Sequence, residues 1–250
     1  MVRAFASGRS WEVSLQLHMR LVHDSEQAKE IGRSLRRMVS SAFVKIPLAP
    51  HAPICFLIAR DLEKEGIPVN FTSTFSARQV VAAALLANVT RTNIFMGRLD
   101  QGLKAELLGA HVSLEVQRIL LRLRQNPGIN TQLIVASLRN WRSMLYTAGC
   151  DAYTVPCKVL QEFLGQDEMI PGSIQSRLGT SYEDRLGIPD HIVAKLGADR
   201  IARLYRVEPE FVEFLLEYRM TTEYQDLDDG EHLVRRFEEA GFGDFFLYSQ

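Results

Sequence analysis

A lysine within a short apolar run is the residue of this sequence with the clearest chemical potential. Lys45 stands between Val44 and Ile46, in a stretch of β-branched and aromatic residues that predicts a buried strand. Burial makes the charged ammonium costly to desolvate, so the pKa of the lysine should fall. A partly neutral amine can attack a ketone and form a Schiff base. The alternative is a structural lysine at a strand end, whose ammonium extends to water.

Short apolar runs alternate with amphipathic stretches over the first two thirds of the sequence. The predicted strands are 13–17, 43–46, 67–72, 92–96, 131–136 and 152–155, and a helix follows each of them. Asp24 or Ser25 caps the first helix, Gly66 ends the second and Ser76 caps the third. Such alternation predicts parallel βαβ units. Six units in succession favour an α/β fold of the (β/α)8 TIM-barrel type, with an open α/β sheet as the alternative.

The pattern changes after Gly165. Residues 165–189 are polar and contain several prolines and glycines, which predicts a loop or linker. Residues 190–250 are charged, with apolar positions at spacings of three and four, which predicts helices. We therefore expect a barrel over 1–164, a linker over 165–189 and a helical C-terminal segment over 190–250. That segment should pack on the barrel or on a neighbouring subunit.

Composition narrows the classes of partner. The chain has 29 basic and 30 acidic residues, so its charge balance indicates neither nucleic acid nor an anionic membrane as a partner. No apolar run reaches the ~18 residues of a membrane span, and residues 1–10 lack the apolar core of a signal peptide. The three cysteines are not spaced as metal ligands; they are Cys55, Cys150 and Cys157. We interpret them as small buried residues of a protein in a reducing cytoplasm. The spacing typical of metal ligands is also absent among the histidines His51, His111, His191 and His232.

Polar residues gather where predicted strands end, which is where a barrel carries its chemistry. These residues are Gln16, Lys45, Asn70, Thr72, Asn93, Ser137 and Arg139. The loop expected after the fourth strand adds Gly97 and Arg98. Two arginines and a serine on adjacent loops predict a phosphate clamp, because guanidinium forks match phosphate oxygens.

Six motifs, in this order, carry a resemblance to a known family. They are Val44-Lys45-Ile46-Pro47, Gly66-Ile67-Pro68-Val69-Asn70-Phe71-Thr72, Phe75-Ser76-Ala77-Arg78-Gln79, Phe95-Met96-Gly97-Arg98-Leu99-Asp100, Ala136-Ser137-Leu138-Arg139-Asn140 and Thr154-Val155-Pro156-Cys157-Lys158-Val159-Leu160. Over roughly residues 11–164 the chain resembles transaldolases; the C-terminal segment lies outside this resemblance. The resemblance implies a class I aldolase barrel and a cytoplasmic enzyme of carbohydrate metabolism.

The resemblance also implies residue roles. Lys45 would form a Schiff base with a ketose phosphate, Thr72 would hold the catalytic water, and Asn70 would contact the donor. The implied phosphate-binding residues are Arg98, Ser137 and Arg139. The implied reaction transfers a dihydroxyacetone unit to an aldose phosphate in the pentose phosphate pathway. No metal or other cofactor is expected, because the iminium accepts the electrons of the broken C3–C4 bond.

Several residues depart from the family pattern. Gln16 stands where transaldolases carry a glutamate that activates the shared water; the related fructose-6-phosphate aldolases carry glutamine there. Phe95 matches the residue that transaldolases carry at its position. Gln16 and Phe95 therefore indicate different members of the family. Gln16 could equally be a satisfied amide of the barrel interior, and the nearby His18 is more simply structural. Asn93, followed by Ile94, replaces the usual Ser-Pro and should contact substrate.

The family barrel has eight strands, whereas this sequence shows six. The first two would carry an aspartate acid/base and a Thr-Asn-Pro turn, and the residues before Val13 are too few to hold them. We therefore expect a barrel incomplete at its N-terminus, with open edges at 13–17 and 152–155 that aggregate or recruit a homo-oligomeric or other partner chain. Three explanations fit the six strands: the natural start lies upstream, a partner chain completes the barrel, or the protein is a non-catalytic sugar-phosphate-binding remnant. We favour the upstream start.

Overall fold

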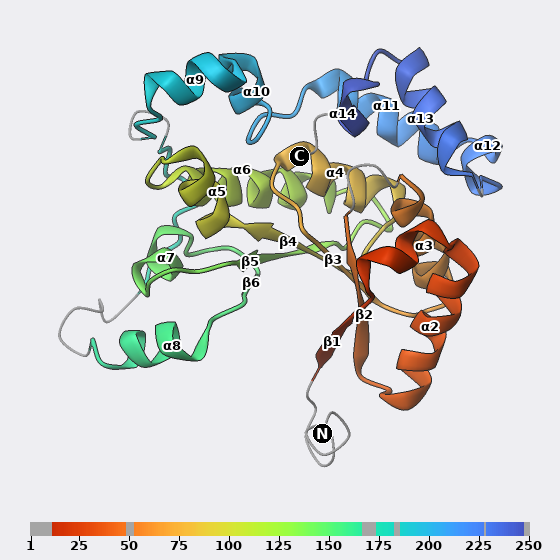
Figure 1. Ribbon diagram of the computed structural model, residues 1–250, viewed down its shortest axis with the longest axis horizontal. Helices are drawn as coiled ribbons and strands as arrows, with labels where there is room; N and C mark the ends of the chain where they lie inside the picture. Colours follow the sequence, from red (N-terminus) through yellow and green to blue (C-terminus); the bar gives the residue numbers. More distant parts are fainter. Residues whose placement is uncertain (1–11, 49–52, 167–173, 183–185, 228, 248–250) are drawn as a thin grey trace.

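Six parallel strands form a single sheet in which the spatial order follows the sequence. The computed structural model describes residues 12–48, 53–166, 174–182, 186–227 and 229–247. The strands are β1 (Val13–Gln16), β2 (Ala42–Pro47), β3 (Val69–Thr72), β4 (Arg91–Phe95), β5 (Gln132–Ala136) and β6 (Ala152–Tyr153). The sheet curls into a half-barrel (Figure 1). This arrangement is consistent with the predicted incomplete barrel, and β1 and β6 are the edges of the described sheet.

A helix follows every strand, as the alternation predicts. The 3₁₀ helix η1 (Met19–His23) comes after β1, and the helices of the barrel are α2 (Ser25–Met38), α3 (Ile54–Lys64), α4 (Ala77–Leu86), α5 (Met96–Leu103), α6 (Leu108–Leu123), α7 (Arg142–Tyr146) and α8 (Cys157–Leu164). The Asp24 side chain caps α2, and Ser76 with Gln79 forms a capping box on α4. One expectation was wrong: α5 starts directly after β4, so Gly97 and Arg98 lie in a helix rather than in a loop.

Alternate side chains of the strands face the helices and fix which face is concave. Phe71 of β3 packs on Phe56 of α3, with ring centroids 5.2 Å apart. Val44 of β2 lies against α2 at Gly32, where an added Cβ would lie 3.6 Å from Val44 Cγ1. Because successive side chains of a strand point to opposite faces, the neighbours of these residues point to the concave side. Lys45 and Asn70 therefore face the inside of the half-barrel.

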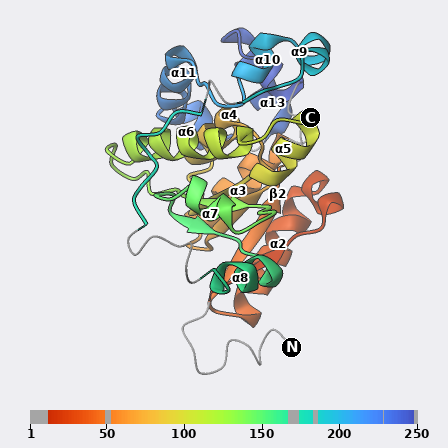
Figure 2. The ribbon, with the colours of Figure 1, turned by 90° about the vertical axis from the view of Figure 1, so that its left-hand side faces the viewer.

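The C-terminal segment is helical, as predicted, but consists of short helices. They are α9 (Asp190–Leu196), α10 (Ala198–Ala202), α11 (Pro209–Arg219), α12 (Thr222–Gln225), α13 (Gly230–Glu239) and α14 (Asp244–Leu247). In both views they lie on the side of α4 and α6 that faces away from the strands (Figures 1 and 2). Phe211, Leu215 and Tyr218, which are apolar residues of α11 at spacings of three and four, are buried. The described residues between Gly165 and Pro189 contain neither helix nor strand.

Buried arginines of the barrel helices hold the C-terminal segment. Arg60 of α3 is 6% exposed and donates to the carbonyl oxygen of Tyr224 at 2.7 Å and to that of Leu227. Arg78 of α4 donates to a carboxylate oxygen of Glu208 at 2.8 Å. Charged donors that satisfy buried acceptors contribute more than neutral ones, so these contacts fix the segment to the barrel.

Cys157 corrects one expectation drawn from composition. Cys55 and Cys150 are buried as predicted, but Cys157 is exposed, because it begins α8 on the side opposite the buried Val159. Within the described part of the chain, no helix is long and apolar enough to cross a membrane, and no group of three or more histidine, cysteine or acidic residues could hold a metal ion. His51 and residues 1–10 lie outside the described residues.

Replacing Arg60 should destabilise the protein without touching the concave face. In Arg60→Ala, the carbonyls of Tyr224 and Leu227 lose a charged donor while still buried. The free energy of unfolding should fall by about 2–4 kcal/mol, measured by urea denaturation. Arg37→Ala is the control, because this side chain is 63% exposed. A loss no larger than that of the control would contradict the anchoring role of Arg60.

Candidate active site

Three predicted site residues lie side by side across the first three strands. The strand register pairs Gln16 with Lys45 and Lys45 with Asn70. Thr72 follows two residues further along β3, on the same face. The Asn93 side-chain amide on β4 donates to the Thr72 hydroxyl oxygen at 3.2 Å. The carboxyl ends of β1 to β4 therefore carry a continuous polar row on the concave face.

Lys45 occupies a half-buried position in this row. Its neighbours along β2, Val44 and Ile46, are fully buried on the helix side. Removal of water from the ammonium lowers the pKa of Lys45. Among the described residues, no carboxylate lies within ion-pair distance of this amine to oppose the effect. A larger fraction of Lys45 is therefore neutral, and thus nucleophilic, than of an exposed lysine at the same pH.

Two buried amides in the row have acceptor oxygens without a partner among the described residues. The Asn70 amide nitrogen donates to Ser14 Oγ at 2.9 Å, and Asn93 donates to Thr72. The Oδ1 atoms of Asn70 and Asn93 are buried and accept no hydrogen bond from the described residues. A buried acceptor left unpaired costs about 1–3 kcal/mol. Both oxygens could be satisfied by the hydroxyl groups of a polyol bound on the concave face.

The predicted phosphate clamp is brought together by close backbone packing. A Cβ added at Gly97 would lie 2.2 Å from the Ser137 carbonyl oxygen and 2.8 Å from Arg139 Cγ. Only glycine permits this approach, which places the start of α5 against the residues that follow β5. Arg98 comes next in α5, and its guanidinium lies over the Phe95 ring, 5.1 Å from the centroid. Arg98, Ser137 and Arg139 are thus neighbours in the fold.

Gln16 departs from the expectation of a satisfied interior amide, whereas His18 has the structural role expected of it. The Gln16 side chain is exposed and makes no hydrogen bond with the described residues, because β1 is an edge strand of the described sheet. The interpretation of Gln16 as a satisfied interior amide is therefore wrong. The exposed His18 accepts a hydrogen bond from the backbone amide of Arg20 at 3.2 Å and caps η1, which is a structural role.

Sequence reasoning missed two residues that contact the elements carrying the predicted clamp. Gln101 accepts a hydrogen bond from the Arg139 guanidinium at 2.9 Å; its spacing of three from Arg98 would have placed it on the same side of a helix. Asp100 accepts from the backbone amide of Gly109 at 2.7 Å and so joins α5 to α6. Burial raises the pKa of Asp100 to about 6, although the Gly109 amide opposes the shift.

An α/β half-barrel with its polar row at the carboxyl ends of parallel strands is the arrangement of a TIM-barrel-type protein with a site at that edge. The family model "Transaldolase/Fructose-6-phosphate aldolase" matches residues 1–202. The match extends beyond the expected limit near residue 164 and includes α9 and α10 of the C-terminal segment. The chain belongs to this family.

Curated relatives agree with the family but match only in part. A protein named "Probable transaldolase" from Aquifex aeolicus is 36% identical over 143 residues, which cover 56% of this chain and 60% of that protein. A "Probable transaldolase" from Desulfatibacillum aliphaticivorans is 33% identical over 138 residues, 54% of this chain and 59% of its own length. The chain therefore spans about three fifths of these relatives.

Asp100 should give stability a pH dependence in mildly acidic solution. Its pKa rises from 3.8 in the unfolded chain to about 6 in the folded one, so the folded state binds the proton more tightly. Its stabilising contribution is present below pH 4 and is lost as pH rises toward 6. Asp100→Asn keeps the acceptor for Gly109 and does not titrate.

Urea denaturation of both proteins at pH 4 to 7 would measure this effect. The unfolding free energy of Asp100→Asn relative to wild type should rise through this window by on the order of 2 kcal/mol. Parallel stability curves for the two proteins would show that the Asp100 pKa does not differ between the folded and unfolded states.

Proposed function

We propose that this protein transfers a three-carbon dihydroxyacetone unit from a ketose phosphate to an aldose phosphate, in carbohydrate metabolism of the pentose phosphate type. The carrying observation is Lys45, a half-buried amine with a lowered pKa, on the concave face beside Gln16 and Asn70. Its proposed role is to form a Schiff base with the donor ketone. Family membership supports aldolase or transferase chemistry.

In the proposed reaction, the neutral Lys45 amine attacks the donor C2 carbonyl, and loss of water gives an iminium. A base removes the C4 hydroxyl proton, the C3–C4 bond breaks, and its electron pair moves into the iminium to form an enamine. An aldehyde leaves. The enamine carbon then attacks the acceptor aldehyde, the new alkoxide takes a proton, and water hydrolyses the iminium to release the product ketose.

The roles that the resemblance implies for the neighbouring residues are compatible with their geometry. Asn70 and Asn93 each offer a buried, unpaired oxygen to substrate hydroxyls. Thr72 already accepts from Asn93, so its own hydroxyl proton is free to orient a water. Phe95 would form a wall of the substrate site, since it lies two residues beyond Asn93 on the same face of β4. Its ring packs edge-on against Phe75 with centroids 5.6 Å apart. The phosphate of the sugar would bind to Arg98, Ser137 and Arg139.

The described concave row lacks a group able to take the C4 hydroxyl proton. Gln16, Asn70 and Asn93 are amides and Thr72 is an alcohol, none of which acts as a base near neutral pH. The proposed turnover therefore needs a base from outside this row, such as a carboxylate. A second chain covering the β1 edge could supply it, in line with the partner predicted for the open edges. Schiff-base formation at Lys45 and complete turnover are consequently separate questions.

Fructose-6-phosphate aldolase-type cleavage is the second candidate function. Its supporting observation is Gln16, which stands beside Lys45 in the register. An amide can orient a water but cannot take its proton, so Gln16 would not assist the water-dependent steps as a glutamate does. An assay without an acceptor aldehyde separates the two activities. Binding of sugar phosphate without turnover would instead indicate a non-catalytic protein.

Borohydride reduction in the presence of fructose 6-phosphate should leave a stable adduct on Lys45, because reduction traps the iminium as a secondary amine. Intact mass and peptide mapping would locate it. A three-carbon adduct would also indicate cleavage. Lys45→Ala should lose the adduct while keeping its circular dichroism spectrum.

The matched control is Lys158→Ala, which removes a lysine side chain that is 87% exposed and should leave trapping unchanged. A folded wild-type protein that gives no adduct at Lys45 would reject the Schiff-base proposal.

Arg139→Ala should weaken the use of phosphorylated donors specifically. Loss of a charge-assisted hydrogen bond of about 1.5–3 kcal/mol should raise the half-saturating fructose 6-phosphate concentration for trapping about tenfold to a hundredfold. Half-saturation by dihydroxyacetone, which has no phosphate, should not change. Arg142→Ala is the control, since Arg142 is exposed and its guanidinium lies 4.8 Å from the Trp141 ring centroid. An equal effect on both ligands would remove Arg139 from the clamp.

A further inference from the structure

A cavity of about 300 Å³ separates α5 from the C-terminal helices α9 and α10. Three cationic side chains line it: Arg98 from α5, Lys195 from α9 and Arg200 from α10. The other lining residues are Leu99, Gly102, Leu103, Ile192, Leu196, Ile201 and Leu204. The lining thus combines positive charge with an aliphatic wall and contains no acidic residue.

This cavity lies at the same edge of the sheet as the polar row. The Leu204 carbonyl oxygen, which is part of the lining, accepts a hydrogen bond from the backbone amide of Ala77 at 2.6 Å. Ala77 begins α4 shortly after the carboxyl end of β3, and Arg98 lies shortly after the carboxyl end of β4. The helices α9 and α10 therefore sit beside the residues that follow two neighbouring strands (Figure 1).

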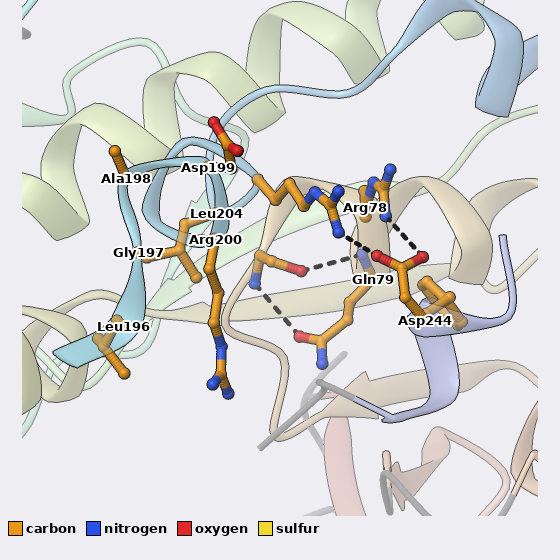
Figure 3. A pocket seen from close by; sticks show the side chains of 12 residues that line it. Arg78, Gln79, Leu196, Gly197, Ala198, Asp199, Arg200, Leu204 and Asp244 are labelled. Atoms are coloured by element: carbon orange, nitrogen blue, oxygen red, sulfur yellow. Dashed lines mark hydrogen bonds and ion pairs between the residues drawn. The ribbon is translucent and has the colours of Figure 1, made fainter. Parts of the chain in front are cut away.

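The acidic residues of the surrounding region are directed elsewhere. Asp244 forms ion pairs with Arg78 and Arg203 in the adjoining cavity of about 450 Å³. Asp199 also lines that adjoining cavity, and Figure 3 shows its side chain extending in the opposite direction from Arg200. Among the described residues, no carboxylate lies within ion-pair distance of Lys195 or Arg98. The charges of Arg98 and Lys195 in the smaller cavity are thus available to an anion.

The chemistry of this lining matches a phosphate group. A guanidinium offers its donors as a fork that fits two phosphate oxygens, and an ammonium adds a compact point charge. The aliphatic wall lowers the local dielectric constant and strengthens the attraction. A volume of about 300 Å³ is at the lower end for small-molecule sites, so the occupant is small.

We propose that Arg98, Lys195 and Arg200 form a second phosphate-binding site, which takes the phosphate group of a phosphorylated sugar or free phosphate. The site depends on the proposed function only through Arg98, which it shares with the clamp of Ser137 and Arg139. The helical C-terminal segment thereby acquires a direct role in ligand binding. A sugar bearing two phosphates could occupy both sites, whereas one bearing a single phosphate would need only the clamp.

Calorimetric titration with inorganic phosphate tests the site, and it is performed on Lys45→Ala so that Schiff-base chemistry plays no part. Phosphate should bind at two sites. Adding Lys195→Ala with Arg200→Ala should remove one of them, lowering its affinity about tenfold or more, while adding Arg139→Ala should remove the other. The control pair, Lys158→Ala with Arg235→Ala, removes the same charge from exposed helix positions in α8 and α13 and should leave both sites intact.

The ligand source is distinguished by comparing fructose 6-phosphate with fructose 1,6-bisphosphate. If the Lys195 and Arg200 changes weaken the bisphosphate as well as inorganic phosphate and leave fructose 6-phosphate unchanged, the occupant is the second phosphate of a sugar. If they weaken inorganic phosphate but neither sugar, the occupant is free phosphate. Equal phosphate isotherms for the Lys195/Arg200 variant and its control would overturn the proposal. Should the double variant fail to fold, Lys195→Glu alone, at an exposed position, must still weaken one phosphate site. This result is independent of whether Lys45 forms an adduct.

Discussion

The two-sided character of the strands is the constraint on which the rest of this structure depends. One side of each strand must be apolar to pack on helices, and the strict alternation of side chains then fixes what the concave side carries. Val44 and Ile46 are buried on the helix side of β2, so the side chain of Lys45 between them must point to the concave face. A single shift in register would bury the ammonium under α2 and α3 and expose the apolar side chains.

The same constraint explains why the polar row is desolvated without being neutralised by partners. Asn70 and Asn93 are almost fully buried on the concave face, yet each keeps one oxygen without a partner among the described residues. Lys45, beside Asn70, is half-buried and has a lowered pKa. Unsatisfied amides and an unpaired amine oppose folding. The packing of α3 and α4 on the outer face offsets this cost and so maintains the arrangement.

The C-terminal segment connects the outer layer with the carboxyl edge. Arg60 and Arg78 fix it to α3 and α4 through buried or partly buried contacts. From that base, the segment reaches the start of α4 through the hydrogen bond between Ala77 and Leu204, and brings Lys195 toward Arg98. The segment lies beyond the six quoted motifs, although the family match includes its helices α9 and α10. It contributes charge next to residues that those motifs contain.

Much of this architecture could be predicted from sequence, because the signals are local. Apolar alternation located all six strands within a few residues, Ser76 and Gln79 marked the start of α4, and the run around Lys45 indicated a desolvated amine. These signals depend on neighbours a few residues apart, which interact whatever the tertiary fold.

The remaining features depend on contacts between distant segments, which only the tertiary structure decides. Gly97 approaches the Ser137 backbone across 40 positions of sequence, and this contact makes neighbours of Arg98 and Arg139. Gln16 is exposed because β1 is an edge strand of the described sheet, which its surroundings in sequence do not reveal. Lys195, on a polar helix surface, gives no local sign that it will face a cavity with Arg98. Such close approaches follow from how whole helices pack, and packing is a property of the complete fold.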